Sequence, residues 1–382
     1  MQTDRVDEQP AGPGDVDTLD FGNLNISVTV DLSVDDSVDP IATVGPRSVR
    51  TVTGGTAINF ENITGGSAAD ILTGNSRDNV ILGGAGNDEI YGLAGADILD
   101  PGTGLSEILA GGTGDDTYRI NNITTIRTLT LIEGSGVVSG GSALGGGSDT
   151  IDFSQVSSGF GTLSFDLSLA SQTLGGLTVN LQDTTLSPNS DYFENVTGST
   201  TLNNNLIGNG AGNILIGGAG VDTLIGGLGN DVLSGGASGD TLDGGAGNDI
   251  ILGGDGTDIL TGGVDRDILI GGNQADNING NAGEDILIGG TTAYDDLNDP
   301  NDTAARKAIL AAWIGSFGYT TRTANIASGV STGGFKLDNT TVFNDSGAVD
   351  TLTGSGDLDW FFLSTGDIDA DRNAVTELAT LI

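Results

Sequence analysis

The chain has 382 residues, 66 of them glycine, and its 52 acidic and 12 basic residues give a formal net charge of −40. It contains no cysteine and no histidine, which excludes disulfides, thiolate catalysis, cysteine-bound zinc and the usual general base. So acidic a chain repels nucleic acid and anionic membranes, and its carboxylates favour binding of hard cations.

Segment 1–64 is predicted to be a strand-rich lead-in. Its stretch SVTVDLS (27–33) alternates apolar and polar residues, as a half-buried strand does. Its first residues carry neither a basic region nor an apolar stretch, and they therefore do not resemble a cleaved signal peptide. No run in the chain is long and apolar enough to cross a bilayer, and we expect no integral membrane segment.

Two motifs of this lead-in recur further along the chain. DTLDF at Asp17 returns as DTIDF at Asp149, and FENITG at Phe60 returns as FENVTG at Phe193. The duplication predicts a second strand-rich lead-in or linker over 120–198.

A nonapeptide of the form G-G-x-G-x-D-x-U-x, in which U is apolar, repeats over 65–119 and again over 199–290. In the second block, Leu or Ile occupies the eighth position of every repeat. In the first block, one inserted residue near Pro101 shifts the last repeats by one position. A disordered low-complexity segment would not keep this period, and both blocks are therefore predicted to be folded.

The remaining region, 291–382, is predicted to contain one helix. Asp299 suits the N-cap, Pro300 the first helical position and Asp302 the first turn. A short stretch at 350–362 returns to the nonapeptide register.

The nonapeptides resemble the RTX, or hemolysin-type, calcium-binding repeat family. The resemblance implies that each nonapeptide is a glycine-rich turn plus a short strand, that two of them make one turn of a parallel β-roll, and that several Ca²⁺ ions lie between successive turns. The expected fold is therefore all-β: two parallel β-rolls, flanking segments with longer strands, and one C-terminal helix.

The acidic residues at position six are the predicted metal ligands. They are Asp70, Asp88, Asp97 and Asp116 in the first block, and Asp222, Asp231, Asp240, Asp249, Asp258, Asp267, Asp276 and Asp285 in the second. Carboxylates about 5 Å apart repel by roughly 3 kcal/mol at an effective dielectric constant of about 20. Folding and Ca²⁺ binding are therefore predicted to be one event. Asn79, Asn204 and Asn213 offer a neutral oxygen, and Glu107 lies beside the insertion, which makes these positions weaker candidates.

Positions seven and nine point out of the roll. On the edge that contains Asp231 these residues are mostly apolar: Ile214, Ile216, Val232, Ser234, Ile250, Leu252, Ile268, Ile270, Ile286 and Ile288. Such a face is rarely left to water. We expect it to pack against 120–198, against the helix region, or against another chain, either a second copy or a cell-surface partner. An exposed sheet of β-prone residues is the alternative.

The sequence shows no catalytic constellation, and we expect no enzymatic activity. The GVSTG motif around Ser331 has no histidine to serve as its base, and the acidic stretch from Asp367 departs from the EF-hand pattern. The expected function is Ca²⁺ binding in a secreted or cell-surface bacterial protein. The resemblance implies that such a protein is exported by type I secretion. We hypothesise that its secretion signal lies in 366–382. Two alternatives stay open: the tail of a secreted lipase or protease, and an adhesin or surface-layer module.

Overall fold

The computed structural model describes residues 2–6, 17–33, 42–44, 47–51, 60–121, 127–133, 147–157, 161–174, 177–183, 193–297, 299–329, 332–338, 340–345, 348–355, 357–363, 366–370 and 378–381. The chain divides into two compact units, unit 1 (Met1–Phe160 and Leu167–Thr197) and unit 2 (Gly161–Asp166 and Gly198–Ile382). Within these described ranges, no helix is both long and apolar enough to cross a membrane. Ser331, the centre of the GVSTG motif, lies outside the described residues.

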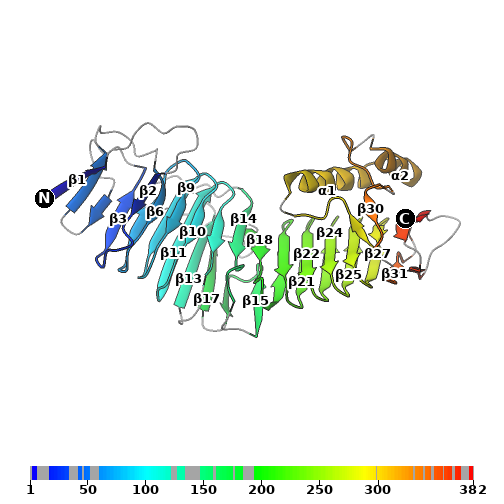
Figure 1. The fold of residues 1–382 in the computed structure, drawn as a ribbon, viewed down its shortest axis with the longest axis horizontal. Helices are drawn as coiled ribbons and strands as arrows, with labels where there is room; N and C mark the ends of the chain where they lie inside the picture. The colour runs from blue at the N-terminus through cyan, green and yellow to red at the C-terminus, as the bar shows by residue number, and fades with distance from the viewer. Residues whose placement is uncertain are drawn as a thin grey trace. The chain divides into compact units, whose positions relative to one another are not determined.

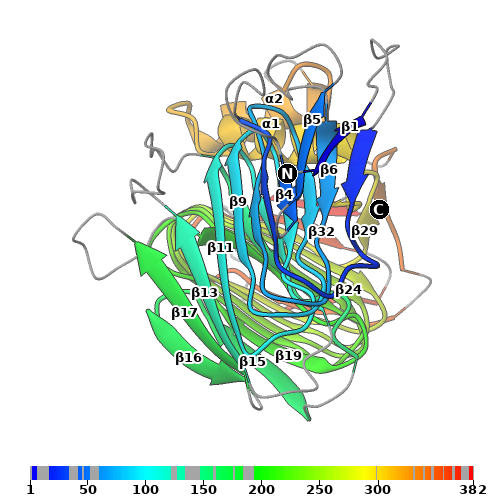
Figure 2. The same ribbon diagram turned by 90° about the vertical axis from the view of Figure 1, so that its left-hand side faces the viewer.

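Unit 1 contains two sheets. The order in one is β1 (Gln2–Val6), β5 (Arg47–Thr51), β4 (Ala42–Val44), β3 (Val28–Asp31), β7 (Ile71–Thr73), β9 (Glu89–Ala94), β11 (Ser106–Thr113), β13 (Arg127–Glu133), β17 (Leu177–Asp183) and β16 (Ser171–Leu174). The order in the other is β2 (Asp17–Asp20), β6 (Phe60–Thr64), β8 (Val80–Leu82), β10 (Ile98–Asp100), β12 (Thr117–Arg119), β14 (Asp149–Asp152) and β18 (Phe193–Thr197). Neighbours are parallel except at β3–β4, β4–β5 and β16–β17. Figure 2 shows β9, β11, β13 and β17 side by side in one sheet.

The duplicated motifs form the same structure twice in unit 1. β2 pairs with β6 and β14 pairs with β18, and both pairs contain a register shift after the first residue, at Asp17 and at Asp149. The segment between the two blocks of repeats does not form a layer of its own, because β13 and β14 pair with the repeat strands β11 and β12. The lead-in strands therefore extend the parallel sheets of the repeats.

Unit 2 contains a regular parallel roll (Figure 1). One sheet runs in the order β15 (Thr162–Asp166), β19 (Asn203–Ile207), β21 (Thr223–Leu228), β23 (Thr241–Ala246), β25 (Ile259–Val264), β27 (Asn277–Ala282), β31 (Thr351–Thr353) and β33 (Ile368–Asp369). The other runs in the order β20 (Ile214–Gly218), β22 (Val232–Ala237), β24 (Ile250–Asp255), β26 (Ile268–Asn273), β28 (Ile286–Ile288), β32 (Trp360–Leu363) and β34 (Leu378–Leu381). Consecutive strands alternate between the sheets, so two nonapeptides form one turn, and the predicted parallel β-roll is confirmed.

The roll of unit 2 does not stop where the second block of repeats ends. β31 pairs with β27 and β32 pairs with β28, and so the stretch at 350–362 adds further strands to the same sheets. Residues 291–345, which we call the cap, are inserted between these parts of the roll. A description as two blocks followed by a separate C-terminal region is therefore incomplete.

The prediction of one C-terminal helix is wrong, because the cap contains two. α1 (Pro300–Trp313) begins as predicted: the Asp299 side chain accepts a hydrogen bond from the Asn301 N–H, and Pro300 occupies the first turn. α2 (Tyr319–Ser328) has no side-chain hydrogen bond at its N-cap, and it ends at Gly329, which adopts a left-handed φ of 73°. Its threonines have low helix propensity. Packing of Ile326 in the core beneath the cap overrides that local preference.

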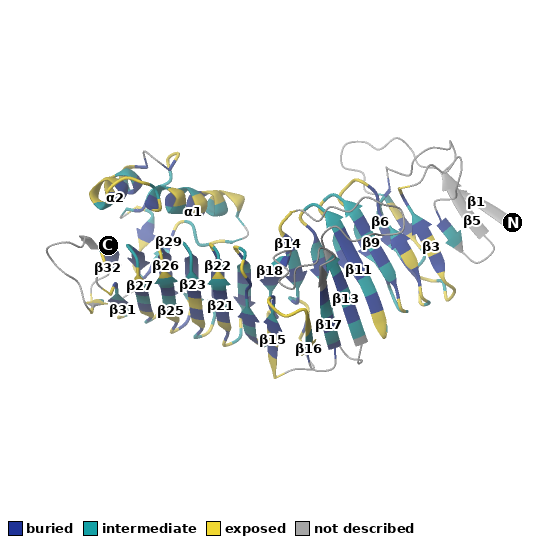
Figure 3. Cartoon of the chain, turned by 180° about the vertical axis from the view of Figure 1, so that it is seen from behind, coloured by how far each residue is buried: buried dark blue, intermediate teal, exposed yellow. Residues whose placement is uncertain are grey.

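The cap covers the part of the apolar face that extends from Ile250 to Ile288. Ile250, Leu252, Ile268, Ile270, Ile286 and Ile288 form one buried cluster with Ile309, Trp313, Ile326, Leu337, Val342, Trp360 and Phe362. Figure 3 shows buried residues on both helices and along the strands of unit 2. Packing against the helix region is thus confirmed for this part of the face, and the burial of these isoleucines within the chain excludes a second chain or a cell-surface partner on them. Val232 is partly buried against the cluster, whereas Ile214, Ile216 and Ser234 are partly buried outside it.

The interior of each roll is the row of residues at position eight. In unit 2 these side chains are 0% exposed from Leu206 to Leu287, and Leu352 and Phe361 extend the row. Leu72, Ile81, Ile90, Leu99, Leu109 and Tyr118 form the equivalent row in unit 1 and are also 0% exposed. The fixed period of nine residues therefore places one apolar side chain inside every turn.

Candidate metal sites along the roll edges

The acidic residues of unit 2 form two hydrogen-bonded ladders, one on each edge of the roll. The N–H of Asp222 donates to Oδ1 of Asp240 at 2.7 Å, and that of Asp240 donates to Oδ1 of Asp258 at 2.7 Å. The same bond then connects Asp258 to Asp276 and Asp276 to Asp350. On the other edge, the corresponding bonds connect Asp231, Asp249, Asp267, Asp285 and Asp359 in sequence.

Unit 1 contains the same arrangement. Asp70 donates to Asp88, and Asp88 donates to Oε2 of Glu107, 19 residues further along the chain instead of 18. Glu107 is 0% exposed and takes the place of an aspartate. Its longer side chain and the residue inserted near Pro101 therefore occur in the same turn.

The other ladder of unit 1 extends beyond the nonapeptides. It begins with Asn79, which donates to Asp97, and continues through Asp116, Asp149 and Glu194. Sequence reasoning left out the last two, and it also left out Asp350 and Asp359 in unit 2. The duplicated DT(I/L)DF and FEN(V/I)TG motifs were the signal that could have found Asp149 and Glu194.

Each ladder carboxylate has one oxygen engaged in the ladder and a second oxygen that faces the turn. All of the predicted ligands are buried, with at most 3% of the residue exposed. Oδ2 of every one of them except Asp70 is buried and accepts no hydrogen bond from the described residues. In Asp70 this oxygen accepts the N–H of Gly66. Buried oxygens that accept nothing are rare in folded proteins, and they indicate an atom still to be bound.

The glycine at position one keeps the space beside this free oxygen open. A Cβ at Gly217 would lie 2.3 Å from Oδ2 of Asp222 and 2.6 Å from the carbonyl oxygen of Gly235, one turn further on. A Cβ at Gly244 would lie 2.3 Å from Oδ2 of Asp249 and 2.7 Å from the carbonyl oxygen of Gly262. The repeat therefore needs glycine here, because any side chain would fill the space between a carboxylate oxygen and a carbonyl oxygen.

Asn204 shows which other oxygens converge on this space. Its Nδ2 donates to the carbonyl oxygens of Ser199, Leu202 and Gly217 at 3.1, 3.0 and 3.2 Å. It also donates to Oδ1 of Asp222 at 2.9 Å. The amide hydrogens of Asn204 thus occupy the position that a cation would take in an aspartate turn. The donor set around that position consists of oxygens alone, which is the set that Ca²⁺ prefers.

The electrostatics of the ladders oppose the charged form of the carboxylates. Burial raises the pKa of Asp231 and Asp240 to about 7, and the charges of neighbouring ladder residues add to the shift. Burial raises the pKa of Asp267 to about 9, and the next cause is the charge of Asp285. The ladder N–H bonds lower these values, but burial outweighs them. Without a compensating cation, the ladders are therefore held partly protonated at neutral pH.

Three residues in unit 2 replace glycine at position four and still adopt a left-handed backbone. They are Ser238, Asp265 and Gln274, with φ values of 83°, 84° and 78°. The local turn is therefore kept, with a side chain in the left-handed region that costs roughly 1 kcal/mol.

The arrangement fits a hard cation bound by few charges and many neutral oxygens. No three acidic side chains of the described residues converge on one point. Each turn of the ladder instead offers one carboxylate oxygen together with backbone carbonyls. The role of the predicted residues as ligands stays a prediction, but their burial and their free oxygens are those that Ca²⁺ ligation requires.

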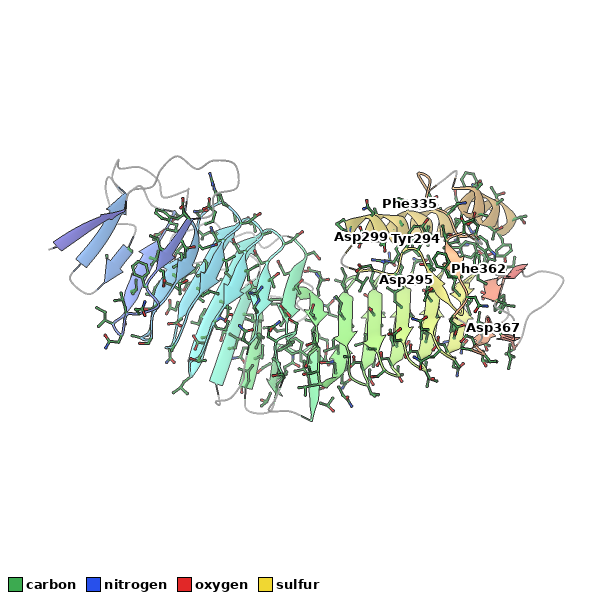
Figure 4. All side chains as sticks on the ribbon, viewed as in Figure 1. Tyr294, Asp295, Asp299, Phe335, Phe362 and Asp367 are labelled. Atoms are coloured by element: carbon green, nitrogen blue, oxygen red, sulfur yellow. The ribbon has the colours of Figure 1, made fainter. Side chains whose placement is uncertain are left out.

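The stretch from Asp367, compared above with an EF-hand loop, belongs to the roll. Oδ1 of Asp367 accepts the N–H of Asp350 at 3.2 Å, and β33 pairs in parallel with β31. Figure 4 shows Asp367 at the C-terminal end of the roll. Residues 371–377 of that stretch lie outside the described residues.

Comparison with known proteins agrees with this geometry. The family described as RTX calcium-binding nonapeptide repeat (4 copies) matches residues 64–99, 101–117, 199–233, 234–269 and 261–292. No curated protein matches the chain.

Proposed function

We propose that this chain, which carries RTX calcium-binding nonapeptide repeats in both units, is a module of a secreted or cell-surface bacterial protein that folds when it binds Ca²⁺. The observation that carries the proposal is the row of buried Oδ2 atoms that accept no hydrogen bond. In this proposal the ladder carboxylates bind Ca²⁺ and so allow the roll to fold, and no catalytic step is included.

The chain's own residues explain why folding depends on the metal. The ladder carboxylates are buried, and burial raises the pKa of Asp276 to about 8. The core of each roll is a single row of residues at position eight, and the glycines lose more conformational freedom on folding than other residues do. Bound Ca²⁺ would supply the positive charge that offsets repulsion between successive carboxylates.

An extracellular location follows from the affinity expected of such sites. Oxygen-ligated sites in extracellular modules bind Ca²⁺ at about 10⁻⁴–10⁻³ M, far above cytosolic concentrations. The chain would therefore remain unfolded inside the cell and fold outside it.

The proposal is tested by a variant in the middle of one ladder, Asp240→Asn. Asn keeps the oxygen that accepts the Asp222 N–H and replaces Oδ2 with an amide, as at Asn204. We expect one Ca²⁺ fewer per chain by calorimetry. Asp243→Asn is the matched control, because Asp243 is exposed on the adjoining strand β23. Equal Ca²⁺ binding by both variants would contradict the proposal.

The secretion signal hypothesised in 366–382 needs a separate test. β33 and β34 in this tail pair with β31 and β32, so a deletion would also shorten the roll. Residues 366–382 are therefore transferred to an unrelated unfolded cargo, and export through a type I system is measured. Export that requires the tail supports the hypothesis, and cargo retained in the cell contradicts it.

A further inference from the structure

The cap is inserted within one turn of the roll, between Gly290 and Asp350. Gly289 and Gly290 begin a nonapeptide, the cap follows, and the ladder resumes at Asp350. The N–H of Asp276 donates to Oδ1 of Asp350 at 2.8 Å, across 74 residues of sequence. Asp350 is 0% exposed, and its Oδ2 is buried without a hydrogen bond. The ladder is thus continuous in space although the chain leaves it and returns.

The carboxylate oxygen of this turn lies beside its glycine as in the other turns of the ladders. A Cβ at Gly271 would lie 2.5 Å from Oδ2 of Asp276 and 2.6 Å from the carbonyl oxygen of Gly289. At Gly289, a Cβ would lie 2.3 Å from Oδ2 of Asp350, and its three nearest atoms all belong to Asp350. The same three kinds of atom surround a Cβ at Gly280, beside Asp285, and the glycine at position one therefore leaves space beside Oδ2 of Asp350 as it does elsewhere in the ladders.

Asp345, at the end of the cap, lies next to the same pair of glycines. A Cβ at Gly290 would lie 3.3 Å from the backbone nitrogen of Asp345. Both carboxylate oxygens of Asp345 are buried, and neither accepts a hydrogen bond of good geometry. In the regular turns described here, only one oxygen of the carboxylate is in that state.

No basic side chain is among the groups that shift the pKa of Asp345. Burial raises its pKa, the charge of Asp367 adds to the increase, and only the nearby backbone N–H groups of Gln274 and Asp345 itself lower it. The charge of Asp345 in turn contributes to the raised pKa values of Asp350 and Asp276. No basic side chain contributes to any of these shifts. Buried carboxylates in this position need a cation.

We propose that Asp345 and Asp350 form a binding site for a hard divalent cation, Ca²⁺, at the point where the cap rejoins the roll. Asp345 belongs to no nonapeptide and adds its carboxylate to the one that the ladder provides. The site therefore has two carboxylates where a repeat turn offers one, and it fastens the end of the cap to the ladder. It rests on the proposed function, because it presumes that the ladder binds Ca²⁺.

The test compares Asp345→Asn with Asp243→Asn in the full chain, since both remove one negative charge. Ca²⁺ binding is measured by calorimetry, and the urea midpoint is measured in Ca²⁺ and in chelator. For Asp345→Asn we expect one Ca²⁺ site to weaken at least tenfold while the others are unchanged. The urea midpoint should fall in Ca²⁺ and rise in chelator, because the variant removes a ligand in one case and a repelling charge in the other.

A purely structural role for Asp345 would move the urea midpoints in Ca²⁺ and in chelator in the same direction. A variant that fails to fold in both conditions would also indicate a structural role. Either sign of a structural role, or Ca²⁺ binding equal to that of Asp243→Asn, would overturn the site. Neither result touches the proposed function, which fails separately if the unmodified chain gains no β signal on addition of Ca²⁺.

Discussion

Replacing Asn204 with Asp should create a Ca²⁺ site where the ladder begins. The amide of Asn204 donates to the three carbonyl oxygens of Ser199, Leu202 and Gly217 and to Asp222. Asp cannot donate these bonds when ionised, and it places a carboxylate oxygen among the oxygens that the amide now holds together. Asn204→Asp therefore removes the amide hydrogens that take the place of a cation, and the variant needs a bound cation instead.

The magnitude follows from the contacts that are lost. The two amide hydrogens are shared among the three carbonyl oxygens and Asp222, and their loss therefore costs the equivalent of two hydrogen bonds, roughly 1 kcal/mol each. Repulsion from Asp222 at the ~4.8 Å spacing of neighbouring strands adds roughly 3 kcal/mol. Uptake of a proton by the new carboxyl limits the sum. We therefore expect unit 2 to lose about 4 kcal/mol of unfolding free energy in chelator at pH 7, and to regain most of it in saturating Ca²⁺.

The assay is urea denaturation followed by circular dichroism, with and without Ca²⁺, together with calorimetric counting of bound ions. Asn205→Asp is the control, because Asn205 is the next residue and its amide reaches only the exposed Ser164 hydroxyl. Asn204→Asp should bind one more Ca²⁺ per chain than Asn205→Asp. An equal loss of stability in Ca²⁺ and in chelator, with no added ion, would refute the reasoning.

Three further predictions concern pH, turn strain and the cap. Burial raises the pKa of Asp231 and Asp240 from 3.8 to about 7, and the folded chain therefore holds more protons than the unfolded chain between these values. The urea midpoint in chelator should consequently fall as pH rises from 5 to 7.5. In Ca²⁺ the urea midpoint should rise over the same range, because protons compete with the metal for the carboxylates. Midpoints that change in the same direction under both conditions would contradict this prediction. Asp265→Gly removes a φ of 84° and should raise the unfolding free energy by about 1 kcal/mol in urea denaturation, and a decrease would show that the turn is not strained. Trp313 is 0% exposed and donates through Nε1 to the carbonyl oxygen of Glu284 at 2.6 Å. Trp313→Ala should therefore lower the unfolding free energy by roughly 3–5 kcal/mol and expose the isoleucine face to a hydrophobic dye. Unchanged dye binding would refute the role of the cap.

The repeats made the roll predictable because one period serves two constraints. The residue at position eight must point inward, and the residue at position six must align with its neighbour one turn away. Any slip in register would break the apolar row from Leu206 to Leu287 and the ladder together. The edge assignments, the stacking every 18 residues and the shift near Pro101 could therefore be read from the sequence.

The residues that sequence reasoning missed depend on contacts between distant segments. Asp350 stacks on Asp276 only because the cap lets the chain return to the same turn. α2 forms because Ile326 packs against the roll, which local propensity does not reveal. The free oxygens of Asp345 follow from the path of the cap, and no motif precedes them.

The most direct test of the account is a Ca²⁺ titration of the metal-free chain followed by far-UV circular dichroism, with Mg²⁺ as control. The account predicts a cooperative gain of β signal at about 10⁻⁴–10⁻³ M Ca²⁺, and no comparable gain with Mg²⁺. A β signal that is already complete in chelator would contradict it, because the rolls would then fold without metal on their ladders.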